Sequence, residues 1–188
     1  VFNNISGNSG AILYTWWLGS EAGNAIADVI FGDYNPSAKL TMTFPLSVGQ
    51  IPIYYNHFNT GRPAQNDSDR FYRSAYIDLS LYPRYEFGYG LSYTSFAYSN
   101  LHIDKQSFKE GEPVGVSFTV TNTGSVDGEE IAQLYIRDLV GSVVRPVAEL
   151  KDFKKLSLKK GESAAVHFLV DAEKLSFYRA DMTFGPEP

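Results

Sequence analysis

Apolar and polar residues alternate over three stretches in the C-terminal half of the chain. A period of two places every second side chain on the same face of a strand, so each stretch predicts a strand with one buried face. The apolar members are Val114, Val116, Phe118 and Val120, then Ala132, Leu134 and Ile136, then Ala164, Val166, Phe168 and Val170. Turn residues such as Asn122-Thr-Gly124 separate the stretches, and short alternating strands with regular turns are typical of a sandwich.

Residues 97–188 are therefore expected to form an all-β, immunoglobulin/fibronectin III-like sandwich. Its predicted core consists of Val116, Phe118, Leu134, Ile136, Val166 and Phe168. We find signals for about five strands where the immunoglobulin-like fold uses about seven. The sequence therefore predicts an incomplete sandwich, with an unpaired edge through which copies of the chain form a homo-oligomer.

Residues 1–45 have a different pattern, which predicts strand, helix and strand. Residues 11–17 are almost continuously apolar, which is typical of a strand covered on both faces. Apolar residues then recur at helical spacing from Ala22 to Ile30, with Ser20 as the expected N-cap and Gly32 as the expected end. Residues 40–44 predict a second short strand. Because so short a segment cannot cover a doubly buried strand, we expect the C-terminal part of an α/β sandwich domain, and a chain truncated at both ends.

Residues 46–96 are rich in tyrosine and arginine. Lysine is absent between Leu40 and Asp104, whereas four arginines (62, 70, 73 and 84) lie there. Enrichment in Tyr and Arg with depletion of Lys is typical of a contact surface. This stretch is predicted to be an interdomain segment that is either functional or packed against another domain.

Composition excludes several classes of function. The net charge of −5 is spread along the 188 residues, which argues against nucleic acid as a partner. No apolar run reaches the roughly 18 residues of a membrane-spanning helix. Cysteine is absent, and His57, His102 and His167 lie far apart, so we expect neither a metal nor another cofactor.

Five segments, in order, resemble glycoside hydrolase family 3, in particular bacterial β-glucosidases. They are GNAIADVIFGDYNPSAKLTMTFP (23–45), QIPIYYNHFNTGRP (50–63), YPRYEFGYGLSYTSF (82–96), VTNTGSVDGEEIAQLYIRD (120–138) and RPVAELKDFKKLSLKKGES (145–163). The resemblance implies an N-terminal β/α barrel outside this chain, then an α/β sandwich domain and a fibronectin III-like domain. It also implies retaining hydrolysis of β-linked glucosides or oligosaccharides in the periplasm or outside the cell.

The resemblance carries no catalytic residue onto this chain. Retaining hydrolysis needs two carboxyl groups roughly 5 Å apart, and in the family these are a barrel Asp and a Glu upstream of Val1. Glu21 follows a predicted helix start, where a carboxylate is favoured by the helix dipole alone. Glu129 and Glu130 are neighbours on a predicted strand, so they point to opposite faces.

His57 and Arg62 are the candidate substrate-binding residues. In similar enzymes the segment that carries them approaches the active site, so they are candidates for contact with the sugar. Packing against the missing barrel accounts for the same composition, and the two explanations stay open.

A stand-alone module that binds carbohydrate or a protein is the alternative function. An upstream reading frame that encodes a barrel with a nucleophilic Asp favours the enzyme, and a start codon just before Val1 favours the module.

The chain by itself is predicted not to hydrolyse an aryl β-glucoside, because the nucleophile of the covalent route is missing. An assay of the purified 188-residue chain against buffer checks this. Turnover well above buffer that is lost in Glu21→Gln would contradict it.

Overall fold

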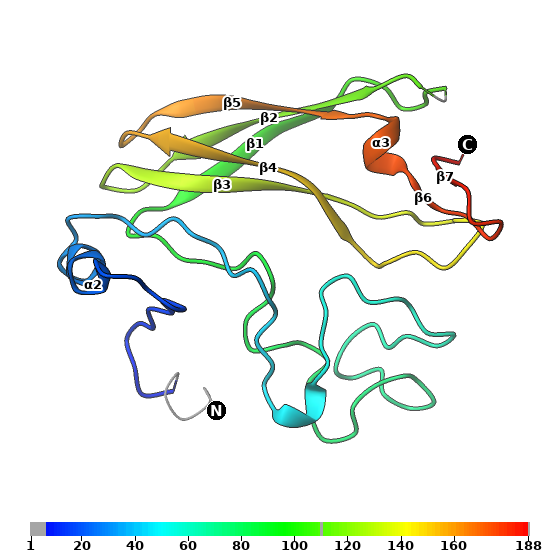
Figure 1. Ribbon diagram of the computed structural model, residues 1–188, viewed down its shortest axis with the longest axis horizontal. Helices are drawn as coiled ribbons and strands as arrows, with labels where there is room; N and C mark the ends of the chain where they lie inside the picture. Colours follow the sequence, from blue (N-terminus) through cyan, green and yellow to red (C-terminus); the bar gives the residue numbers. More distant parts are fainter. Residues whose placement is uncertain (1–6, 110, 188) are drawn as a thin grey trace. The chain divides into compact units, whose positions relative to one another are not determined.

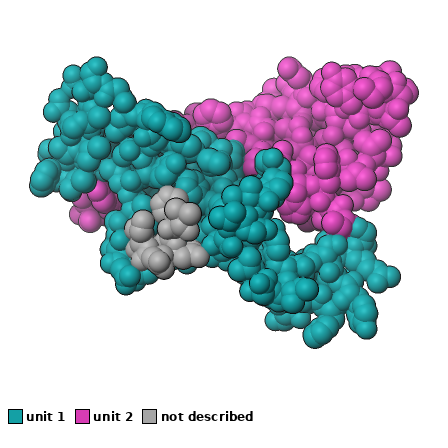
Figure 2. Space-filling model, turned by 60° about the horizontal axis from the view of Figure 1, so that its bottom comes forward, with its two compact units in different colours: residues 1–54, 61–91 teal, residues 55–60, 92–188 magenta. Residues whose placement is uncertain are grey.

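The computed structural model describes residues 7–109 and 111–187 (Figure 1). The chain divides into two compact units (Figure 2). The first unit comprises residues 1–54 and 61–91, and the second unit comprises residues 55–60 and 92–188. No helix in the described residues is long and apolar enough to cross a membrane.

In its described residues the first unit contains one α-helix, α2 (Ala22–Phe31). Gly32 ends it at φ 88°, and its N–H bonds to the carbonyls of Asp28 and Val29, as the pattern predicted. The predicted N-cap is wrong by one residue: Glu21 occupies that position without a side-chain cap bond. Its carboxylate instead accepts a hydrogen bond from Asn24 Nδ2 at 2.6 Å.

Neither of the two strands predicted in residues 1–45 is present. Residues 11–17 form no ladder and are largely exposed, and Trp17 is 94% accessible. Within the described residues no strand lies against them, and a buried strand exists only where neighbouring strands take its N–H and C=O groups. Residues 40–44 instead form a few backbone hydrogen bonds with residues 84–89. Phe44 and Tyr85 make an isolated bridge there.

The second unit is a sandwich of antiparallel strands (Figure 1). One sheet has the order β1 (Phe96–Ile103), β2 (Val114–Asn122), β5 (Ser163–Val170). The other sheet pairs β3 (Gly128–Ile136) with β4 (Glu149–Leu158). The short helix α3 (Ala172–Leu175) leads to a two-stranded sheet of β6 (Phe177–Tyr178) and β7 (Phe184–Gly185). The fibronectin III-like sandwich predicted from the alternating pattern is confirmed.

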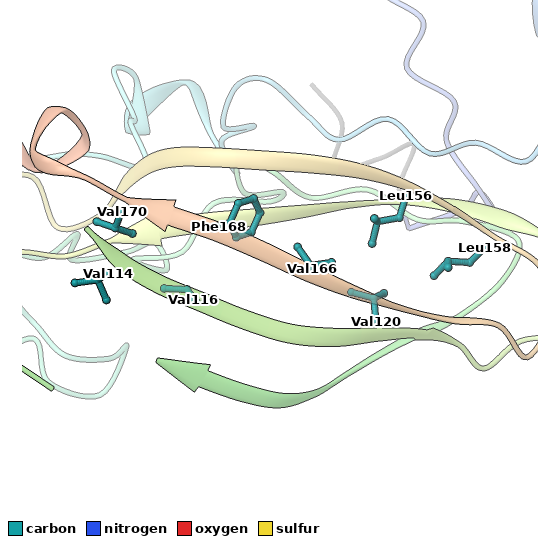
Figure 3. Packing of buried hydrophobic residues seen from close by; sticks show 8 residues of the cluster. All are labelled: Val114, Val116, Val120, Leu156, Leu158, Val166, Phe168 and Val170. Atoms are coloured by element: carbon teal, nitrogen blue, oxygen red, sulfur yellow. The ribbon is translucent and has the colours of Figure 1, made fainter. Parts of the chain in front are cut away.

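The core lies between the two sheets (Figure 3). The β2–β5 register places Val116 opposite Phe168 and Phe118 opposite Val166, so the apolar face of each strand meets that of its neighbour. All six predicted core residues belong to this cluster, although Phe118, Leu134 and Ile136 are only partly buried. Leu156 and Leu158 of β4 close it from the other sheet.

A fully buried asparagine ties the two sheets together at one end. Asn122, the last residue of β2, donates from Nδ2 to the carbonyls of Val126 (2.9 Å) and Leu158 (3.1 Å). Its Oδ1 accepts from Thr94 Oγ1 at 2.6 Å and from Gly124 N–H at 3.1 Å. One side chain thus satisfies groups from four parts of the second unit.

Asn122→Ala is predicted to lower the free energy of unfolding by at least about 2 kcal/mol, because the buried Thr94 hydroxyl and Leu158 carbonyl each lose a partner. Urea denaturation of the purified protein checks this, with Ser125→Ala at an exposed position of the same turn as the control. Equal unfolding midpoints for the two variants would contradict it.

The 3-10 helix η1 and the loops of residues 46–54 and 61–91 complete the first unit. The 3-10 helix η1 (Val48–Gln50) is capped by Ser47, whose Oγ accepts from Gly49 N–H at 3.3 Å. The rest of this stretch contains no helix or strand, and it is connected by backbone hydrogen bonds between loops together with side-chain hydrogen bonds.

Candidate functional site

The two candidate residues lie in different units. His57 belongs to the second unit, and its ring is exposed. Its Nδ1 lies 3.0 Å from the Phe58 carbonyl oxygen. Because a carbonyl can only accept, Nδ1 carries the proton, and Nε2 of the neutral ring is then an acceptor.

Arg62 belongs to the first unit and is exposed. Its carbonyl accepts a hydrogen bond from Ser74 N–H at 2.8 Å, and Pro63 forms a parallel bridge with Ser74. The backbone of Arg62 is therefore tied to the loop that contains residues 66–74, and this loop determines where the guanidinium can reach.

A set of side-chain hydrogen bonds shapes this loop. Asn66 Oδ1 accepts from the N–H groups of Ser68 (2.9 Å) and Asp69 (3.1 Å), an Asx turn. Asp67 Oδ1 accepts from Leu81 N–H at 2.7 Å. Arg70 donates to the carbonyls of Asp67 and Ile77 and lies 3.5 Å from the Asp67 carboxylate.

Gln50 joins η1 to residues 80–82. Its side chain is 1% accessible, and Nε2 donates to the carbonyls of Ser80 (3.0 Å) and Tyr82 (3.4 Å). Its Oε1 accepts from Leu46 N–H at 2.6 Å. Residues 46–50 and 80–82 are thereby locked together although neither is in a sheet.

The turn at residues 70–73 presents two aromatic rings. Arg73 N–H bonds to the Arg70 carbonyl at 3.3 Å, so Phe71 and Tyr72 occupy the corner positions. The two residues are 87% and 89% accessible, and Tyr72 has φ 58°, a conformation that normally favours Gly or Asn. Strained, exposed aromatic residues held by a polar frame are typical of binding loops.

Sequence reasoning did not single out this turn. The enrichment in tyrosine indicated the right segment, but a positive φ at Tyr72 has no signal in the residue type. Ser74, whose N–H bonds to the Arg62 carbonyl, comes two residues after Tyr72, so Tyr72 belongs to the loop that is tied to the Arg62 backbone. The structure thus adds Tyr72 to the edge that carries Arg62.

The candidate carboxylates are placed as the strand argument predicted. Glu129 pairs with Lys155 at 2.7 Å, whereas Glu130 points the other way and is buried. Glu130 accepts a hydrogen bond from the Tyr98 hydroxyl at 2.9 Å. Burial, together with this bond to Glu130, raises the pKa of Tyr98 above its ordinary value. The Glu130–Tyr98 pair therefore links β3 to β1 as a structural contact.

Within the described residues, neither Glu21 nor a histidine belongs to a cluster of side chains that could bind a metal. Glu21 is exposed at the start of α2 and bonds to Asn24. In residues 7–109 and 111–187 no three Asp, Glu or His side chains gather as a metal-ligand set.

Two family models match the chain. Residues 2–93 match the glycosyl hydrolase family 3 C-terminal domain, and residues 130–185 match the fibronectin type III-like domain. The chain belongs to glycoside hydrolase family 3. The resemblance stated from the five sequence segments is confirmed.

Named relatives are glycosidases that are much longer than this chain. The periplasmic beta-glucosidase of Salmonella typhimurium is 49% identical over 95% of the chain and 23% of its own length. The beta-xylosidase of Formosa agariphila is 40% identical over 99% of the chain and 25% of its own length. The chain thus spans about a quarter of the length of these relatives.

Solved structures support the same family. The beta-glucosidase of Listeria innocua in complex with gluconolactone has a TM-score of 0.92 and 40% identity, over all of this chain and 26% of that one. The same enzyme has also been solved with glucose, and a mutant of it with laminaribiose.

Asp67→Asn is predicted to make the free energy of unfolding depend less on pH in the acid range. The hydrogen bonds from Leu81 N–H and the Ser80 side chain, with a smaller effect of Arg70, hold the pKa of Asp67 below its ordinary value of 3.8. A carboxyl group whose pKa is lower in the folded state stabilises that state at pH values above its ordinary pKa. This contribution is lost as the pH falls through the folded-state pKa.

Chemical denaturation between about pH 2 and pH 6 measures the effect. The stability difference between wild type and Asp67→Asn should be largest above pH 4 and shrink below it. Asp78→Asn, at an exposed position of the same segment, is the control. A difference that is constant across this range would show that Asp67 titrates alike in both states.

Proposed function

We propose that this chain is the C-terminal part of a periplasmic or secreted, retaining β-glycosidase that acts on β-linked glucosides or oligosaccharides. The observation that carries the proposal is the 49% identity to a periplasmic beta-glucosidase over 95% of the chain. The catalytic carboxylates belong to the part of the protein outside this chain, and the chain alone is inactive.

Within this proposal the chain has three parts. Residues 1–45 are the C-terminal part of the α/β sandwich domain, 46–96 are the interdomain segment, and 97–188 are the fibronectin III-like domain. The apolar side chains exposed on residues 11–18 suit a surface that the remainder of that domain covers. The edge strands of the fibronectin-like sandwich remain the proposed surface for a homo-oligomer.

The proposed substrate-contact residues are His57, Arg62 and Tyr72. The guanidinium of Arg62 can donate several hydrogen bonds to sugar hydroxyls, and the Nε2 atom of His57 can accept one. The ring of Tyr72 offers a flat apolar face in solvent, which suits the C–H face of a sugar ring. Packing against the barrel is the competing role. A mutation that removes a sugar contact raises KM, whereas one that disturbs packing lowers stability.

Arg62→Ala in the full-length enzyme is expected to raise KM for a β-linked glucose disaccharide by roughly tenfold or more, because one charged hydrogen bond contributes about 1.5–3 kcal/mol. Tyr72→Gly should also raise this KM, and it should fold well because glycine relieves the positive φ. Steady-state kinetics with both variants measure the change.

Arg137→Ala, an exposed arginine of the second unit, is the matched control and should leave KM unchanged. A lowered melting temperature with unchanged KM in Arg62→Ala and Tyr72→Gly would assign both residues to domain packing and contradict the proposed contact.

A further inference from the structure

Residues 55–60 are part of the second unit although they lie far from it in sequence. The His57 carbonyl accepts a hydrogen bond from Val147 N–H at 2.9 Å, and Phe58 forms an antiparallel bridge with Pro146. Residues 57 and 58 thus pair with the connection between β3 and β4 in the manner of a short added strand.

Tyr55 anchors the start of this segment. Its hydroxyl oxygen accepts a hydrogen bond from Leu150 N–H at 3.2 Å, and its ring meets that of Tyr135 edge to face, with 5.9 Å between centroids. Tyr135 and Leu150 are register partners at the point where the β3–β4 ladder shifts. The Leu150 N–H thus bonds to a side chain outside the ladder, next to the point where the regular pairing shifts.

The surface that holds the segment is itself braced. Arg145, next to Pro146, is only 12% accessible and bonds to the Glu149 carboxylate at 2.7 Å. Its guanidinium also lies 3.9 Å from the centre of the Phe177 ring, which is buried. Pro146 and Val147 are therefore flanked by residues that β4 and β6 keep in place, so they form a firm support for His57.

We infer that the fibronectin-like unit is a positioning module for substrate recognition: it holds residues 55–60 as an added strand, and Tyr55 is the positioning residue that orients His57. This rests on the proposed contact between His57 and the sugar. It assigns the fibronectin-like unit a direct part in substrate binding, through the backbone of residues 55–60, which belong to the interdomain segment in sequence.

Kinetics of the full-length enzyme with a double-mutant cycle test this inference. Tyr55→Leu should raise KM for a β-linked glucose disaccharide about as much as His57→Ala, each by about tenfold, with a much smaller change in kcat. Because Tyr55 acts through His57, adding Tyr55→Leu to His57→Ala should change KM no further. Tyr54→Leu, at the neighbouring exposed tyrosine, is the matched control and should leave KM unchanged.

Amide hydrogen exchange of the same variants tests the capture of the segment independently of sugar binding. Tyr55→Leu should speed exchange at Val147 and Leu150, whereas Tyr54→Leu should not. Tyr55→Phe keeps the ring and loses only the hydroxyl, so it should speed exchange at Leu150 alone and keeps the test open if Tyr55→Leu folds poorly.

The outcomes separate this inference from the proposed function. An unchanged KM in His57→Ala refutes the sugar contact of His57, and with it the positioning role, while faster exchange at Val147 in Tyr55→Leu would still show the capture. If His57→Ala raises KM but Tyr55→Leu does not, the positioning inference alone is overturned. It is also overturned if Tyr55→Leu raises KM equally in the His57→Ala background.

Discussion

Buried polar groups must find hydrogen-bond partners, and this requirement shapes both units of the chain. In the second unit, Asn122 satisfies groups at the end where the sheets converge. In the first unit, where residues 46–91 have almost no regular structure, Gln50 takes that role. Each of these side chains forms hydrogen bonds with several backbone groups. It thereby connects segments that are not paired with one another in a ladder.

The exposed residues that are proposed to contact the sugar depend on this polar frame. Arg62 is tied to Ser74, and the loop before Ser74 is shaped by Asn66, Asp67 and Arg70. A frame of this kind can hold Tyr72 in a conformation that costs about 1–3 kcal/mol without a compensating core. Polar residues thus position the groups proposed to meet the sugar, while the apolar sandwich supplies stability.

The fibronectin-like unit combines both kinds of support. Its core of alternating apolar residues makes a rigid body (Figure 3). This unit offers Val147 N–H from the connection between β3 and β4, and Leu150 N–H from the start of β4, to residues 55–60. In the proposed enzyme, the integrity of this domain would affect substrate recognition through residues 55–60, because these residues bond to it.

Local patterns in the sequence determined the family, the sandwich core and the end of α2 at Gly32, because alternation, motif order and glycine placement depend on nearby residues only. They misplaced the strand at residues 11–17, since a strand needs partners that a local pattern does not contain. Only the tertiary structure decided that Glu130 is buried beside Tyr98, that Tyr72 has a positive φ and that residues 55–60 join the second unit. Each of these depends on residues distant in sequence, and an apolar or polar period carries no information about which distant residues will meet.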